Sequence, residues 1–195
     1  MKGMETDYRV YRYTRSEWVI NIFKYGLIIC FISYLFFDSL VMAIVISPMI
    51  IFAIKAHLEE KKSKRLARLN LEFKEMINFV ASGLNAGYSM ENAFRNARKD
   101  IRLIYPSGSY IEEELKIIVR GIDNSIPIER LISDFADRCG LEDVYNFSEV
   151  IKVAKKTGGD TIKIIGKTVE NISDKIGVAK EIDTLMAGKV LEQKI

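Results

Sequence analysis

The sequence predicts an all-α protein, in which an N-terminal transmembrane helical hairpin is followed by a cytosolic antiparallel six-helix bundle. Two observations lead to this prediction. The apolar residues of the 195-residue chain concentrate between Trp18 and Leu58, and most of the charge follows that segment. Beyond Lys61, apolar residues recur every three or four positions, which is the period of an amphipathic helix, and no alternating strand pattern is present.

The composition excludes several classes of protein. Hydrophobic residues make up 49% of the chain and charged residues 28%, which is typical of a folded protein and not of a disordered or fibrous one. Two cysteines, Cys30 and Cys139, are too few for a disulfide framework or a thiolate metal site. A net charge of +3 does not by itself indicate binding to nucleic acid, and we expect no nucleic-acid partner.

Residues 18–37 and 40–58 are two apolar runs separated only by Asp38 and Ser39. A helix of about twenty residues is roughly 30 Å long, which matches the hydrocarbon thickness of a bilayer. We therefore expect two transmembrane helices within 18–58. A secretory signal peptide is disfavoured, because no small-residue cleavage site precedes the second run. One long interrupted span, a re-entrant hairpin and a buried hairpin of a soluble protein remain as alternatives.

Lysines and arginines flank the apolar hairpin on both sides, and its connecting turn contains none. The positive-inside rule then places both ends in the cytoplasm. We expect a cytosolic N-terminal arm at 1–17, a basic juxtamembrane linker at 59–67 and a helical domain at 68–195. The chain would be a multi-pass protein of the cytoplasmic membrane. Contact with anionic lipid and a purely topogenic role explain the basic stretch equally well.

Six helices are predicted after the hairpin, joined by short turns. Gly87 is expected to cap the first and Ser89 to begin the second, and a loop at 105–109 precedes the third, at 111–122. Pro127 is placed in the first turn of the fourth, which Gly140 stops, and the fifth covers about 141–156. Gly158 and Gly159 would end the fifth helix and Asp160 would cap the long last one.

Each predicted helix except the third is assigned an apolar stripe that faces the core. The stripes are Leu66, Leu69, Phe73, Ile77, Val80 and Leu84; Met90, Ala93, Phe94, Ala97, Ile101 and Ile104; Ile128, Leu131, Ile132 and Phe135; Val144, Phe147, Ile151 and Ala154; and Ile162, Ile165, Val169, Ile172, Ile176 and Ala179.

A weak internal echo links two of the predicted turns. Residues 87–91 and 124–129 each place a turn, an apolar residue and a glutamate at a helix start. An ancient repeat and ordinary helix-start chemistry explain the echo equally well.

Two stretches imitate functional motifs. Residues 161–168 end in Gly-Lys-Thr like a phosphate-binding loop, but Thr161 stands where that motif needs its first glycine, and no strand precedes it. We interpret Gly166–Thr168 as helix interior. His57, the only histidine, precedes two glutamates as in a sensor-kinase phosphoacceptor region, but no nucleotide-binding domain accompanies it, so we interpret it as an interfacial residue. A single histidine also excludes the commonest zinc sites and a Ser-His-Asp triad.

The remaining acidic run, Glu112-Glu-Glu114, is interpreted as a charge cluster at a helix N-terminus. We expect no catalytic residue, no cofactor and no metal site.

Three segments of the helical domain match a known pattern. Residues 76–93 fit a segment of the type Φ-x-x-Φ-x-x-Φ-A-x-x-L-x-A-G-x-S-Φ-x-x-A, which includes Gly87, Ser89 and Ala93. Residues 125–138 fit Gly-x-Pro-Φ-x-x-x-L-x-x-Φ-A-x-R through Pro127 and Arg138, with Ser125 in place of glycine.

The third segment, residues 154–161, fits A-x-x-T/S-G-G-D/N-L through Gly158, Gly159 and Asp160, with Thr161 in place of leucine. In this combination the chain resembles the F domain of type II secretion and type IV filament systems (GspF/TadB-like), and most closely the TadB-type membrane protein of Tad/Flp pilus assembly. Members of that family continue into further membrane spans, so we expect a fragment or a shortened member.

The resemblance implies a platform protein of the cytoplasmic (inner) membrane that couples a hexameric secretion ATPase to pilin assembly and is not itself an enzyme. It also implies pilin subunits, membrane lipid and a second platform protein or homo-oligomer as partners. The rival hypothesis is a membrane-tethered helical signalling or regulatory domain. The two-residue turn Asp38–Ser39 disfavours it, because a turn of this length provides no extracytoplasmic sensor domain. A nucleotide-using or lipid-modifying enzyme around Lys167 ranks third.

Overall fold

The computed structural model describes residues 41–105, 108–157 and 161–192, together with Tyr8, Phe23 and Leu27. All regular secondary structure in these residues is helical, which confirms the all-α prediction. The expected first membrane helix, 18–37, lies outside the described residues except for Phe23 and Leu27, and the side chains of 41–55 lie outside them as well. Within the described part, no helix is both long and apolar enough to cross a membrane.

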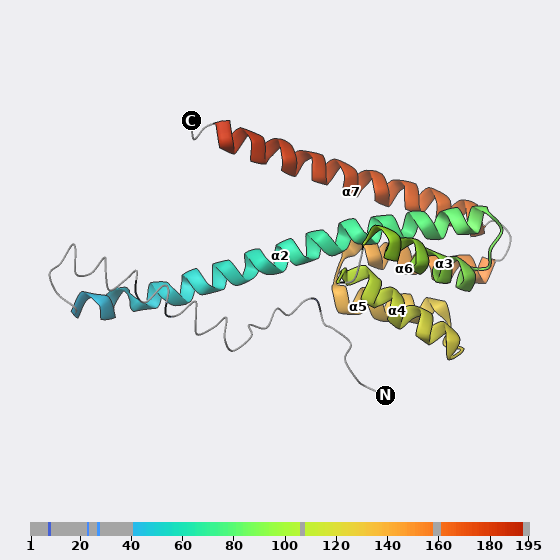
Figure 1. The fold of residues 1–195 in the computed structure, drawn as a ribbon, viewed down its shortest axis with the longest axis horizontal. Coiled ribbons are helices and arrows are strands. Elements are labelled where there is room, and N and C mark those ends of the chain that lie inside the picture. The colour runs from blue at the N-terminus through green and yellow to red at the C-terminus, as the bar shows by residue number, and fades with distance from the viewer. Residues whose placement is uncertain are drawn as a thin grey trace. The chain divides into compact units, whose positions relative to one another are not determined.

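Six helices follow one another in the described ranges (Figure 1). They are α2 (Val41–Asn85), α3 (Met90–Ile104), α4 (Tyr110–Asp123), α5 (Ile128–Cys139), α6 (Glu142–Thr157) and α7 (Thr161–Glu192). The bounds of α3 to α6 agree with the predicted ones to within a few residues. The predicted linker at 59–67 is itself helical, because α2 continues through it without interruption for 45 residues.

The chain divides into two compact units with a boundary between Arg65 and Leu66. In the unit that ends at Arg65, the basic stretch of α2 pairs with acidic residues one turn earlier. Lys64 Nζ donates to Glu60 Oε1 at 2.6 Å, and this hydrogen bond lowers the pKa of Glu60. His57 Nδ1 lies 3.9 Å from Glu60 Oε2, and the Arg65 guanidinium lies 4.7 Å from the centre of the Tyr8 ring.

The second unit is a helical bundle built around Phe73. The Phe73 ring lies 6.3 Å from the Phe135 ring and 5.8 Å from the Phe147 ring, so α2, α5 and α6 meet there. Successive helices from α3 to α7 pack on one another, and α3 to α6 gather beside the C-terminal part of α2 in Figure 1. The predicted stripes of α2, α5 and α6 are confirmed as core, apart from Leu66, which is half-buried.

Three residues predicted to face the core are exposed instead: Ile104, Ile162 and Ala179. Ile104 and Ile162 lie at the ends of their helices, where neighbouring helices no longer cover them. Ala179 belongs to the second half of α7. α7 has 32 residues and α3 to α6 only 12 to 16, and among the described side chains of α7 the last buried one is Ile176.

Cys139 closes α5 as a buried residue, and its Sγ lies 3.5 Å from the carbonyl oxygen of Ala136. Burial raises the pKa of the Cys139 thiol to about 11, so the nucleophilic thiolate is scarce at neutral pH.

We expect Cys139 to resist alkylation by iodoacetamide at pH 8 in the folded chain, in a Cys30→Ser background that leaves one thiol. Since two units of pKa separate it from an ordinary thiol, its rate should fall by about two orders of magnitude relative to the protein in guanidinium. Mass spectrometry over time measures both rates. Equal rates in the folded and unfolded protein would contradict the buried position.

Candidate interaction site

The motif residues that the structure describes belong to two turns and to the end of α5. Gly87, Ser89 and Ala93 belong to the turn between α2 and α3 and the start of α3. Pro127 lies between α4 and α5, and Arg138 lies near the end of α5. Gly158, Gly159 and Asp160, the residues of the third motif, lie outside the described residues.

The turn between α2 and α3 reverses the chain tightly. Gly87 has φ +87°, and the N–H groups of Gly87 and Tyr88 donate to the carbonyls of Leu84 (2.9 Å) and Gly83 (3.1 Å). This is the hydrogen-bond pattern of a Schellman motif, which confirms Gly87 as the cap. Ser89 Oγ accepts a hydrogen bond from the N–H of Asn92 at 3.4 Å, which confirms the predicted N-cap.

The same turn brings α2 and α3 into close contact at Ala93. A β-carbon placed on Gly83 would lie 3.2 Å from the β-carbon of Ala93, which is fully buried. Small residues at both positions therefore set how closely the two helices approach.

The turn between α4 and α5 repeats this pattern. Ser125 has φ +61°, and the N–H groups of Ser125 and Ile126 donate to the carbonyls of Ile122 and Gly121, each at 3.0 Å. Pro127 was predicted in the first turn of this helix. It is instead the N-cap of α5, one residue before the helix begins at Ile128. In both turns the left-handed residue is followed two positions later by the N-cap and four positions later by a glutamate, so the echo in the sequence reflects one shared turn geometry.

Ser125→Gly should stabilise the domain. A side chain in the left-handed region is strained, and glycine removes that strain at the cost of a more flexible unfolded chain. We expect the free energy of unfolding to rise by about 0.5 to 1 kcal/mol. Gly87→Ala, the reverse change at the matching position, should lower it by about 1 kcal/mol. Urea unfolding followed by circular dichroism measures both, and a loss of stability in Ser125→Gly would contradict the turn geometry.

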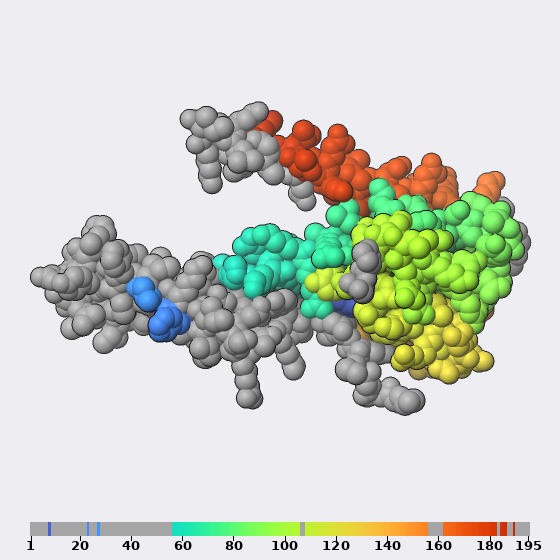
Figure 2. Space-filling model, viewed as in Figure 1, coloured from blue at the N-terminus to red at the C-terminus, as the bar shows by residue number. Residues whose placement is uncertain are grey.

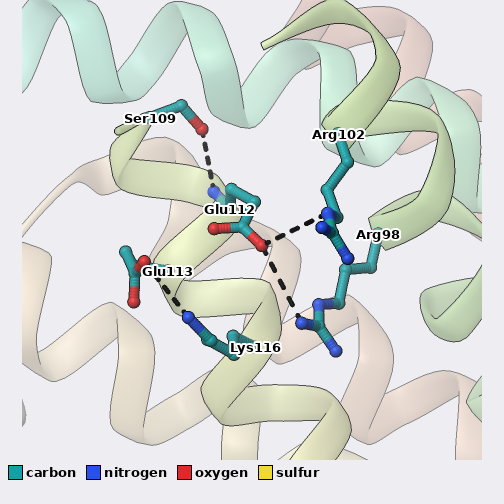
Figure 3. Close-up of polar contacts among 6 residues, drawn as sticks. All are labelled: Arg98, Arg102, Ser109, Glu112, Glu113 and Lys116. Carbon is teal, nitrogen blue, oxygen red and sulfur yellow. Dashed lines mark hydrogen bonds and ion pairs between the residues drawn. The ribbon is translucent and has the colours of Figure 1, made fainter. Parts of the chain in front are cut away.

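The run Glu112-Glu-Glu114 is not a uniform charge cluster, because its three carboxylates have different partners. Glu112 Oε1 lies 3.8 Å from Arg98 and 4.0 Å from Arg102 of α3, and Figure 3 shows both guanidinium groups directed at it. Glu113 is exposed and pairs with Lys116 at 3.4 Å. The backbone N–H of Glu112 donates to Ser109 Oγ at 3.0 Å, which makes Ser109 the N-cap of α4.

Glu114 is the most deeply buried member of this run, and it pairs with Arg138 of α5. The exposed fractions of the two side chains are 1% for Glu114 and 12% for Arg138, so the pair is almost entirely removed from water. Arg138, singled out by the motif, therefore neutralises a buried charge and ties α5 to α4.

Glu72 of α2 is a second buried carboxylate that joins helices. It accepts a hydrogen bond from Arg68 Nε at 2.8 Å and another from the backbone N–H of Ile111 at 3.1 Å. The second bond satisfies one of the free N–H groups in the first turn of α4, where the helix dipole also favours a negative charge.

Asp143, at the start of α6, makes the corresponding connection to α7. It accepts hydrogen bonds from Asn70 Nδ2 of α2 at 3.1 Å and from Lys175 Nζ of α7 at 2.9 Å. The bond to Asp143 raises the pKa of Lys175. The buried carboxylates Glu72, Glu114 and Asp143 thus connect different helices, and each pairs with a cation or an N–H donor.

The stretch that imitates a phosphate-binding loop has no loop geometry. Gly166, Lys167 and Thr168 lie inside α7, and Thr168 Oγ1 donates to the backbone carbonyl of Ile164 at 2.9 Å. No group of histidine, cysteine, aspartate or glutamate side chains within the described residues is arranged to hold a metal ion. Figure 2 shows α3 and α4 on the near face of the described part.

Comparison of the chain with models of protein families, with curated proteins and with solved structures finds no match.

Proposed function

We propose that the chain is a platform protein of the cytoplasmic membrane in a type IV filament or type II secretion machine of the Tad/Flp pilus type. Its helical bundle would lie in the cytosol, bind a hexameric secretion ATPase and couple that motor to pilin assembly. A membrane hairpin formed by residues 18–37 and 40–58 would anchor it.

The turn at Ser125 is the observation that carries this proposal. The family pattern has glycine at this position, and the residue here adopts the left-handed conformation that glycine accommodates without strain. The turn at Gly87, which belongs to the first motif segment, has the same left-handed conformation and the same hydrogen-bond pattern. The motifs therefore agree with the backbone geometry at two independent places.

The polar chemistry of the bundle also supports a binding role. Its buried carboxylates, Glu72, Glu112, Glu114 and Asp143, serve to join helices and are engaged by cations or N–H donors. A rigid bundle of this kind suits a protein that transmits force between a motor and a membrane assembly.

Co-purification tests the proposal. The full chain, carrying an affinity tag at its natural expression level, is extracted from the membranes of its own cells in mild detergent. We expect the hexameric secretion ATPase of the filament system to be enriched with it, as identified by mass spectrometry. Recovery of the tagged chain without that ATPase, under conditions that keep the hexamer assembled, would contradict the proposal.

The membrane topology is tested separately with single cysteines. Ser39→Cys lies in the proposed external turn and Ser63→Cys in the proposed cytosolic stretch. A membrane-impermeant maleimide added to spheroplasts, in a Cys30→Ser background, should label the first and not the second. Labelling of Ser63→Cys in sealed cells would reverse the orientation.

A further inference from the structure

The second half of α7 carries an exposed apolar stripe. We define the α7 stripe as Val178, Ile182, Leu185 and Met186, whose side chains are between 53% and 62% exposed. The first three are spaced by four and three residues, which places them in one row along the helix. In Figure 1 this half of α7 runs past α3 to α6. The row is therefore apolar surface and not part of the core.

The α7 stripe does not continue the seam through which α7 packs into the bundle. That seam consists of Ile165, Val169, Ile172 and Ile176, which are all buried. Ile176 and Val178 are two residues apart, so their side chains point about 200° apart around the helix axis. The apolar residues of α7 thus change to the opposite face of the helix, and that face points away from the bundle.

Opposite charges stand at the two ends of the stripe. Asp174 lies one helical turn before Val178. Lys189 lies one turn after Leu185, and both charged side chains are exposed. A second copy of the helix that runs in the opposite direction presents lysine to aspartate at each end and an aliphatic side chain to each aliphatic side chain between them. The stripe is therefore self-complementary, as a two-fold symmetric contact requires.

The other described charges beside the stripe have separate places. Lys175 Nζ donates to Asp143 of the same chain at 2.9 Å. Lys180 lies four residues after Ile176 and so on the side of the seam. Glu181 is exposed at one margin of the stripe. In an antiparallel pair the two Glu181 side chains would meet near the symmetry axis, where water screens them and their repulsion costs little.

A membrane surface matches the stripe less well than a second copy does. Residues 170–192 contain five acidic and three basic residues, so this half of α7 is not attracted to anionic lipid. A helix that lies in the lipid interface has a broad apolar face and a polar face rich in cations. The α7 stripe is narrow, and Asp174 and Glu181 border it.

We propose that the α7 stripe joins two copies of this chain through an antiparallel pair of α7 helices. Val178 of one copy packs against Leu185 of the other, the two Ile182 side chains meet near the centre, and Asp174 pairs with Lys189 at each end. An interface this short is smaller than that of a permanent dimer, so the association is reversible. The dimer goes beyond the proposed function and does not depend on it.

Disulfide trapping tests the antiparallel direction. Two preparations of the full chain with different tags, in a Cys30→Ser/Cys139→Ala background, carry Val178→Cys or Leu185→Cys and are mixed in mild detergent and oxidised. We expect the mixed disulfide and not the two symmetric ones, because like positions would lie about 10 Å apart along the helix, beyond disulfide reach. Thr184→Cys, exposed on another side of α7, is the control and should give no crosslink. Symmetric disulfides without the mixed one would contradict the antiparallel pair.

Charge reversal tests the pairing at the two ends. Sedimentation equilibrium of the full chain in a density-matched detergent gives the Kd of the dimer, and circular dichroism checks folding. Asp174→Lys and Lys189→Asp should each raise the Kd by roughly tenfold, because each turns two attractive pairs into repulsive ones. The double variant Asp174→Lys/Lys189→Asp exchanges the charges and should bring the Kd back to within about threefold of the wild type. A double variant that binds no more tightly than either single variant would contradict the pairing.

The remaining outcomes concern other occupants of the stripe. A wild-type chain that sediments as a monomer at every concentration up to its solubility limit would overturn the dimer and leave the proposed platform function untouched. A dimer whose Kd is the same in all charge variants would place the interface elsewhere and also overturn the inference. An environment-sensitive dye on Ile182→Cys should shift to the blue as the chain dimerises. The same shift on adding anionic vesicles to the monomer would instead assign the stripe to the membrane.

Discussion

Arg138→Ala should destabilise the bundle by about 3 to 5 kcal/mol, because it leaves the carboxylate of Glu114 buried without its partner. The two side chains are 12% and 1% exposed, so water cannot replace the guanidinium without opening the contact between α4 and α5. Chemical denaturation of the full chain, followed by the helical signal in circular dichroism, measures the loss.

A second substitution separates the buried charge from the lost packing. Glu114→Gln in the Arg138→Ala background replaces the buried carboxylate with a neutral amide of the same shape, and we expect it to recover a large part of the lost stability. The double variant should therefore be more stable than Arg138→Ala alone. If Arg138→Ala lies within about 1 kcal/mol of the wild type, the pair is not the buried ion pair described here.

Gly121→Ala should also lower stability, although alanine is normally the better helix former. A β-carbon on Gly121 would lie 2.4 Å from Cδ2 and 2.8 Å from Cδ1 of Leu131, which is itself buried in α5. We expect a net loss of about 1 to 2 kcal/mol, since overpacking costs about 1 to 3 kcal/mol and helix propensity returns at most 1. Urea denaturation measures the change.

Gly166→Ala is the matched control for this substitution. Gly166 lies inside α7, where an added β-carbon meets no atom within 4 Å. The same change should therefore stabilise the chain by about 0.5 to 1 kcal/mol. In a Leu131→Ala background, Gly121→Ala should lose most of its cost because the clashing atoms are gone. A destabilising effect of equal size at both glycines would contradict the close approach of α4 and α5.

The elements that depend on local sequence were predicted well. The N-cap at Ser89 and the left-handed caps at Gly87 and Gly140 are set by a few neighbouring residues, and they fix where α2, α3 and α5 begin or end. The core stripes followed from the helical period for the same reason. The burial of Phe73 against two other phenylalanines agrees with its place in a predicted stripe.

The contacts that depend on tertiary packing were not predicted. Glu114 was interpreted as part of a charge cluster at a helix N-terminus, and its partner, Arg138, is 24 residues away on another helix. One signal was present: Glu114 lies three residues after Ile111 and one before Leu115, within the apolar stripe of α4. The period of α7 showed an apolar seam, but only the lengths of the other helices determine how much of it is covered.

The sequence likewise could not predict which charged residues of α3 are exposed. The sequence shows four basic residues in α3. The helical period alone does not show that Glu112 is buried beside Arg98 and Arg102 while Leu103 is exposed. Which cations remain outward-facing depends on how α4 packs against α3.

Filament assembly in a deletion strain tests the central claim most directly. The gene is removed without affecting its neighbours, and surface filaments are counted by electron microscopy while immunoblots confirm that pilin and the ATPase are still made. If the chain is the platform protein, filaments should disappear and pilin should accumulate in the membrane. A plasmid copy of the wild-type chain should restore the filaments and lower membrane pilin to the wild-type level. Filaments at wild-type number in the deletion strain would contradict the assignment.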